Sequence, residues 1–278
     1  MSSTKSTNDI QIHKSTTITN FSAFLDSLIN SPEPTDPKRA DLICYWLKDF
    51  QQYLSQEKEF DAKRIKSYKR GDVIKVNLGF NVGSEQGGLR YAIVLDKENR
   101  HNAKTITIIP LSSQKANKPI NDRDISLGQE LYSRLKSKYD SAFETLTQRR
   151  IDCDKKMENV TFTLDILRKI LSNTSNITLG PPDEHASIQD LIAAQTENLD
   201  HLRKEEQQIH EEEQSLQKIS AELHRMRNGS VAKIEQITTI SKQRIYDPKK
   251  SGDVLDGIRF SDAAMEKINE KLKDLYIF

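Results

Sequence analysis

The sequence of 278 residues has few of the features that mark secreted and membrane proteins. It has 2 cysteines, Cys44 and Cys153, which are too few and too far apart for a disulfide framework or a zinc motif. No apolar run approaches the roughly 18 residues that a membrane-spanning helix needs. The polar residues 1–15 lack the apolar centre of a signal peptide. We therefore expect a cytoplasmic protein without a membrane segment.

The sequence also lacks the motifs of several enzyme classes. Its 6 histidines show neither an HExxH pattern nor the spacing of a metal site. It has no phosphate-binding P-loop and no G-x-S-x-G nucleophile turn. We expect a protein that uses no metal and no cofactor.

The net charge of +1 hides an uneven distribution of charge along the chain. Residues 65–127 carry 11 Lys and Arg against 6 Asp and Glu, and residues 229–278 carry 9 against 8. Residues 128–228 carry 14 against 18. The positive segments could attract phosphate groups, although ordinary surface charge explains them equally well.

The first 64 residues divide into a tail and a helical extension. Residues 1–18 are polar and predict a disordered tail. Within the extension, residues 19–64, apolar side chains recur with helical spacing over Phe21–Ile29 and again over Arg39–Tyr53. Three prolines within residues 31–37 separate these two helices. The extension either packs on the rest of the chain or docks a partner, and its Trp46 favours packing.

Short strands are predicted after residue 70. Residues Val73–Leu78, Tyr91–Leu95 and Thr105–Leu111 are rich in β-branched and aromatic side chains, and Asp124–Leu127 is a shorter candidate. Short strands joined by glycine turns favour a small, strongly bent barrel.

A different pattern fills residues 128–228. One apolar row has a seven-residue spacing and a second row follows four residues later, interrupted at Arg150: Tyr139, Leu146, Cys153, Val160 and Leu167, then Phe143, Met157, Leu164 and Leu171. After a Gly-Pro-Pro turn a second seam repeats with Gln195 in one slot: Ile188, Leu202, Ile209, Leu216 and Leu223. This pattern predicts an antiparallel coiled-coil hairpin with arms of roughly 60 Å. Each seam is buried against the other arm or against a partner.

The most informative segment lies between the first two predicted strands. The loop Gly83-Ser84-Glu85-Gln86-Gly87-Gly88 ends at Arg90, and a basic residue with Gly71-Asp72 opens the preceding strand. Its glycines allow close approach of the backbone to a ligand. The acid, amide, hydroxyl and guanidinium of this loop could hold and cleave a phosphodiester backbone.

These ordered residues closely resemble the MazF/PemK family of toxin ribonucleases. The segment Ile234–Ile245 resembles the late strand of that family, and Phe260–Leu275 resembles its closing helix. The resemblance implies an α+β fold, in which a small SH3-like β-barrel formed by residues 65–127 and 229–278 is interrupted by the long antiparallel helical hairpin.

The resemblance also implies a function. Such a protein would be the toxin of a type II toxin-antitoxin system, an endoribonuclease that cleaves single-stranded RNA at specific short sequences without a metal. Its implied partners are single-stranded RNA, a cognate antitoxin and a second copy in a homodimer. The alternative is a non-enzymatic nucleic-acid-binding or gyrase-binding module with the hairpin as its interaction arm.

The resemblance assigns candidate site residues as well. Arg90 matches the essential arginine of the family, Ser112 stands at the position of its catalytic threonine, and Glu85 is the third catalytic candidate. The residues themselves leave open a salt bridge from Arg90 to Glu85 or Asp96, and a strand-end cap by Ser112. The candidate RNA-binding residues are Gly83, Ser84, Gln86, Gly87, Gly88 and Tyr91. Tyr91, at a position that is usually proline in the family, either stacks on a base or fills the core.

Overall fold

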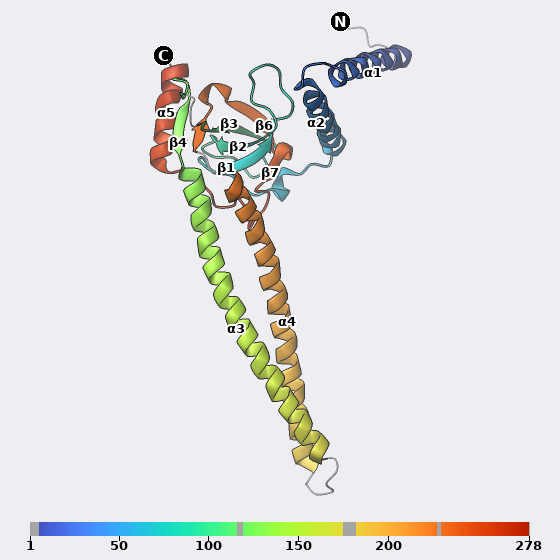
Figure 1. Ribbon diagram of the computed structural model, residues 1–278, viewed down its shortest axis with the longest axis vertical. Coiled ribbons are helices and arrows are strands. Elements are labelled where there is room, and N and C mark those ends of the chain that lie inside the picture. Colours follow the sequence, from blue (N-terminus) through green and yellow to red (C-terminus); the bar gives the residue numbers. More distant parts are fainter. Residues whose placement is uncertain (1–5, 116–118, 175–181, 227–228, 278) are drawn as a thin grey trace. The chain divides into compact units, whose positions relative to one another are not determined.

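The computed structural model in Figure 1 describes residues 6–115, 119–174, 182–226 and 229–277. These residues form two compact units. The first contains the chain up to Arg70 together with Ile74–Pro110 and Glu235–Lys249. The second contains Gly71–Val73, Leu111–Ile234 and the chain from Lys250 onward. The N-terminal extension therefore shares a unit with most of the strands, whereas the helical hairpin shares one with the C-terminal helix.

The N-terminal tail corrects an expectation. Helix α1 spans Thr7–Ile29, so the prediction of disorder up to residue 18 was wrong from residue 7 onward. The reason is a capping box: the Ser6 hydroxyl accepts the Asp9 amide at 3.2 Å, and the Asp9 carboxylate accepts the Ser6 amide at 3.1 Å. Residues 1–5 lie outside the described residues.

Helix α2 spans Asp36–Gln56 and has Pro37 in its first turn, where a missing N–H costs no hydrogen bond. It packs against α1 through a small apolar cluster that contains Leu28, Ala40 and Ile43. Phe80, from the loop after the first strand, packs against the same cluster. The extension therefore packs on its own chain, as Trp46 suggested.

Five strands meet in the first unit. β1 (Val73–Asn77), β2 (Leu89–Val94) and β3 (Thr105–Ser113) match the expected strands within two residues at each end. The late segment supplies β6 (Thr238–Ser241) and β7 (Ile245–Asp247). β2 and β6 pair antiparallel with β3, and β7 pairs antiparallel with β1. Two sequence blocks separated by the hairpin thus share one sheet.

The core of this unit follows the period of two that strands impose. Alternate residues of β1, β2 and β3 point into one apolar cluster, joined by side chains from the late segment: Ile74, Val76, Leu78, Ala92, Val94, Ile106, Ile108, Ile240 and Ile245. Short 3-10 turns at Ala62–Arg64 and Lys242–Arg244 flank it.

The sheet is open, which corrects the expected closed barrel. Its strands follow the path β4-β5-β3-β2-β1-β7, with β6 paired to β3, and among the described strands no pairing joins the two ends. The end strands β4 (Ile125–Gly128) and β7 have four and three residues, and Pro248 follows β7 directly. Such short strands offer few hydrogen bonds for closure, and a proline offers no donor. The α+β class is confirmed.

The second unit contains the hairpin. Helices α3 (Glu130–Thr174) and α4 (Pro182–Arg225) lie side by side in Figure 1 and share a buried cluster. The cluster holds both expected seams: Leu146, Cys153, Ile209 and Leu216, with Tyr139, Met157 and Leu202 beside them. The apolar seam is thus buried against its own other arm, and the two-helix hairpin is confirmed. Supercoiling of its arms stays a prediction, and the Gly-Pro-Pro turn lies outside the described residues.

Two seam positions depart from the regular pattern. Phe143 is 50% exposed and stacks on Tyr139 with ring centroids 6.0 Å apart, so it lies beside the seam. Arg150 pairs with Glu213 at 2.9 Å and with Glu206 at 3.7 Å across the hairpin. Because only one alignment of the two arms joins these charges, they favour the observed register.

The base of the hairpin is tied to the C-terminal segment. The Lys138 ammonium donates to the carbonyl oxygens of Asp253, Val254 and Asp256 at 2.8–2.9 Å. The Glu130 carboxylate accepts the amide of Ser261, the N-cap of helix α5 (Asp262–Tyr276), at 2.6 Å. In the same unit β4 pairs with β5 (Ser230–Ala232).

The two cysteines should report the packing of the hairpin. Cys44 is exposed on α2, whereas Cys153 is 1% exposed in the seam, where burial raises the pKa of its thiol. We expect Cys153 in a Cys44→Ser protein to react with a thiol reagent at pH 8 about 100-fold more slowly than Cys44 in a Cys153→Ala protein. The two rates should converge in denaturant. Equal rates in the native protein would contradict the buried seam.

Candidate functional site

The loop between β1 and β2 is closed at its base by main-chain hydrogen bonds. The Gly88 amide donates to the Gly79 carbonyl at 2.6 Å, and the Leu78 amide donates to the Gly88 carbonyl at 2.9 Å. Gly79, Gly83 and Gly88 have φ values of 82°, 61° and 74°, which residues with a Cβ rarely adopt. This explains why glycines recur at these places in the sequence.

A glutamine from the late segment holds the tip of the loop. The Gln236 side-chain oxygen accepts the Gln86 amide at 2.8 Å, and its side-chain nitrogen donates to the Ser84 carbonyl at 3.2 Å. Within the loop, the Asn81 side chain donates to the Gln86 carbonyl at 2.7 Å. The loop therefore has a defined shape although its side chains are largely exposed. Gln236 was missed by the sequence reasoning because nothing in its own segment marks it as a loop contact.

Arg90 lies near the start of β2 and is exposed. Its Nε donates to the Gly87 carbonyl at 2.9 Å, which fixes the guanidinium against the glycine loop. Among the described residues Arg90 forms no ion pair within 4 Å, so the alternative of a salt bridge to Glu85 or Asp96 is not realised there. Asp96 instead accepts a hydrogen bond from the Asn99 side chain at 2.6 Å. The two terminal nitrogens of Arg90 thus remain available to an anion from solvent.

The remaining loop candidates lie in the same unit. Glu85 is exposed and its amide donates to the Val82 carbonyl at 3.3 Å, which forms a tight turn. Gly83, Ser84 and Gly88 are exposed, whereas Gln86 and Gly87 are half-buried. The six candidate site residues from Gly83 to Gly88, and Arg90 beyond them, therefore lie on one loop.

Two candidates lie elsewhere. Tyr91 is half-buried in β2, with the Lys75 ammonium 5.4 Å from the centre of its ring. Ser112 belongs to the second unit, where it is half-buried in β3 and pairs with Val231 of β5. Ser112 is thus a strand residue near the end of β3, as expected.

An open groove of about 1190 Å³ lies beside the loop within the first unit. Loop residues, among them Gly83, Glu85, Gly87 and Arg90, form part of its lining. Helix α2 forms another part, through one face on which residues recur every three or four positions: Leu42, Tyr45, Trp46, Asp49, Gln52, Tyr53 and Gln56. The groove is thus lined both by the candidate loop and by the N-terminal extension, in which no site residue was expected.

Half-buried polar contacts hold α2 beside the loop. The Asp49 carboxylate accepts the Asn77 side chain at 2.7 Å, and the Gln243 side chain donates to the Tyr53 carbonyl at 2.8 Å. Arg244 donates to the Asn77 carbonyl at 2.8 Å and lies 5.2 Å from the Trp46 ring. Burial lowers the pKa of Arg244 and raises the pKa of Tyr53, which keeps the phenol neutral.

In the part of the chain that the structure describes, no group of three or more His, Cys, Asp or Glu side chains is arranged to hold a metal ion. The helices of that part are also too short or too polar to cross a membrane.

Comparison with known proteins bears on the loop. A search of curated proteins gave no match. Residues 69–166 match the family model described as "PemK-like, MazF-like toxin of type II toxin-antitoxin system". The matched region contains the glycine loop, Arg90, Ser112 and most of α3, but neither the N-terminal extension nor the late segment. The match confirms the resemblance: residues 69–166 are similar to the PemK-like, MazF-like toxins of type II toxin-antitoxin systems.

Proposed function

We propose that this protein is an endoribonuclease toxin that cleaves single-stranded RNA at short specific sequences, without a metal. The observation that carries the proposal is the exposed guanidinium of Arg90, which is held on the Gly87 carbonyl and has no carboxylate partner among the described residues. An arginine in such a position can bind a phosphate through two parallel N–H···O bonds. The family match, which names toxins of type II systems, supports this reading.

In the proposed reaction the ribose 2′-oxygen attacks the adjacent phosphorus while the bond from phosphorus to the 5′-oxygen breaks. Glu85 takes the proton of the 2′-hydroxyl, and solvent in the open groove supplies a proton to the leaving 5′-oxygen. Arg90 stabilises the extra negative charge on the non-bridging oxygens in the transition state. The products are a 2′,3′-cyclic phosphate and a 5′-hydroxyl.

Ser112 is proposed to donate a hydrogen bond to the same phosphate. Support comes from the family match, because the matched residues 69–166 contain both Arg90 and Ser112. A Ser112→Ala protein tests this assignment by its rate of cleavage.

The loop is proposed to bind the RNA backbone and bases close to the scissile bond. Gly83, Gly87 and Gly88 allow the strand to approach, and Ser84, Gln86 and Tyr91 add polar and aromatic contacts. We also propose that a cognate antitoxin covers this region, that the active form is a homodimer, and that the protein acts in the cytoplasm.

Cleavage of an unstructured RNA by the purified protein in EDTA tests the proposal. We expect fragments with a 5′-hydroxyl, which a polynucleotide kinase labels without prior phosphatase treatment, and a 2′,3′-cyclic phosphate. Cleavage at a few short sequences, and not at every nucleotide, is the expected pattern. RNA that stays intact while the protein binds RNA or DNA gyrase would favour the non-enzymatic alternative.

A further inference from the structure

Helix α2 contacts different parts of the first unit through two faces. One face, with Ala40 and Ile43, is buried against α1. The other face lines the groove and runs from Leu42 to Gln56 along the helix; we call it the groove face. Because the family match begins at residue 69, the family does not account for this second face.

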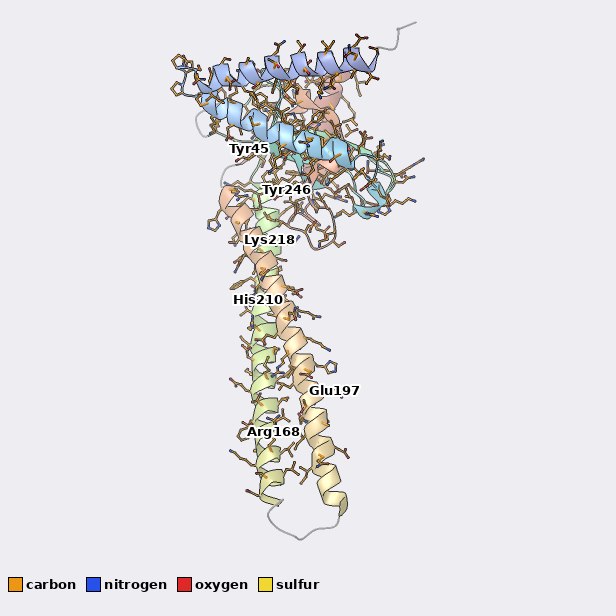
Figure 2. All side chains as sticks on the ribbon, turned by 90° about the vertical axis from the view of Figure 1, so that its right-hand side faces the viewer. Tyr45, Arg168, Glu197, His210, Lys218 and Tyr246 are labelled. Atoms are coloured by element: carbon orange, nitrogen blue, oxygen red, sulfur yellow. The ribbon has the colours of Figure 1, made fainter. Side chains whose placement is uncertain are left out.

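Two tyrosines of the groove stand out by their exposure. Tyr45 of α2 is 63% exposed and Tyr246 of β7 is 64% exposed, although both line the groove. Figure 2 labels both side chains. Phe80 and Trp46 are packed on neighbouring side chains, and the Lys75 ammonium lies 5.7 Å from the centre of the Tyr246 ring. Exposed aromatic rings in a groove offer flat faces for stacking at little conformational cost.

We propose that α2 forms the base-recognition surface of the RNA groove, with Tyr45 and Tyr246 stacking on unpaired nucleobases and selecting the cleaved sequence. This inference rests on the proposed function, because it takes the strand in the groove to be the substrate whose backbone passes Arg90. Unpaired bases stack on tyrosine rings and expose their hydrogen-bonding edges. Gln52, Gln56 and Gln243 line the same groove and carry the donors and acceptors that those edges require.

The charged side chains that line the groove favour nucleobases over the phosphate backbone of RNA as its main ligand. Its lining contains the cations Arg64, Arg90 and Lys249 and four carboxylates: Asp49, Glu59, Asp61 and Glu85. Such a lining cannot bind a polyanion by charge alone. If all three cations contacted phosphates, the salt dependence of single-strand binding would have a log–log slope of only about −2. Stacking must therefore supply much of the affinity.

The size and rigidity of the groove fit a polymeric ligand. Its volume of about 1190 Å³ exceeds the roughly 300–1,000 Å³ typical of small-molecule sites. The contacts of Asp49 with Asn77, of Gln243 with the Tyr53 carbonyl and of Arg244 with the Trp46 ring hold α2 in place. A fixed α2 keeps the distance between the recognised base and Arg90 constant, which is what selection of a cleavage position requires.

Substitution of Tyr45 in the full chain tests the inference by two readouts. The first is the affinity for a fluorescein-labelled, mixed-sequence, 2′-O-methyl RNA of about 12 nucleotides, which binds but cannot be cleaved. The second is the set of sites cut in a long unstructured RNA. We expect Tyr45→Ala to raise the Kd at least about 5-fold and to change the preferred sites, and Tyr246→Ala to act in the same direction.

Two matched variants separate stacking from packing. Tyr45→Phe keeps the ring and should stay within about 2-fold of the parent Kd. Leu54→Ala removes a side chain of α2 that is 54% exposed and does not line the groove, and should also leave the Kd and the cut sites unchanged. Thermal melting shows whether each variant keeps the parent fold.

The outcomes for this inference and for the proposed function are distinct. Unchanged Kd and cut sites in folded Tyr45→Ala would overturn the inference and leave the endoribonuclease proposal intact. A parent protein that binds the probe but cuts no RNA would overturn the proposed function, and the Kd comparison would still decide the role of Tyr45. Loss of binding to a protein partner, with RNA binding preserved, would assign the α2 face to that partner and overturn the inference.

Discussion

Replacement of Arg90 by alanine is expected to lower the rate of RNA cleavage by about 100- to 1000-fold. The guanidinium is exposed, is oriented by its Nε–H donated to the Gly87 carbonyl at 2.9 Å, and forms no ion pair among the described residues. Its loss therefore removes charge stabilisation from the transition state without removing a structural contact in the core. Single-turnover cleavage with saturating protein measures this effect on the chemical step.

Arg90→Lys is the matched control for geometry. Lysine keeps the positive charge but cannot hold the Gly87 carbonyl and bind a phosphate with two parallel donors at the same time. We expect an intermediate rate and an unchanged melting temperature for both variants. Undiminished cleavage by a folded Arg90→Ala protein would remove Arg90 from the mechanism.

Replacement of Gly79 by alanine is expected to lower the free energy of unfolding by about 3 kcal/mol and to reduce RNA binding with it. Gly79 has a φ of 82°, and a Cβ at this position would lie 2.7, 2.8 and 2.9 Å from three carbon atoms of the Trp46 ring. The Trp46 ring is held by Arg244 on one side, so it cannot move away without breaking a contact. Chemical denaturation measures the stability change, and probe affinity reports the displacement of the groove face of α2.

Gly83 provides the comparison. Its φ is 61°, but no atom lies within 4 Å of a Cβ built there. Gly83→Ala should therefore show only the backbone cost of about 1 kcal/mol. Combining Gly79→Ala with Trp46→Ala should cost less than the sum of the two single changes, because the steric conflict is then absent. Equal effects of Gly79→Ala and Gly83→Ala would show that the contact between Gly79 and Trp46 has no energetic weight.

Local patterns predicted those parts of the fold whose determinants are close in sequence. The strands from Val73, Leu89 and Thr105 follow from β-branched runs, and the hairpin follows from seven-residue spacing of apolar side chains. The glycines that the loop motif contributes occur where φ is positive or the backbone is closely approached. The polar N-terminus was misjudged because its composition hid the capping pair Ser6 and Asp9.

Barrel closure was also misjudged from sequence, because it depends on how many hydrogen bonds the end strands can offer. The end strands β4 and β7 are too short to pair with each other, so the sheet stays open. The resemblance to a family predicted that the late segment joins the same fold as the early strands, but it did not predict that the sheet stays open.

The candidate site also has a part that local sequence predicts and a part that only the tertiary structure shows. Arg90 and its glycine loop can be predicted from the sequence, because one contiguous run of residues specifies both the turn and the positive charge. The Gln236 contact joins residues 150 positions apart, and the groove face of α2 meets the loop through Trp46 and Gly79. Periodicity reports which face of a helix or strand is apolar, but not which distant segment covers it. Only packing of the whole chain decides that, because the burial of those faces is shared among segments that no local pattern connects.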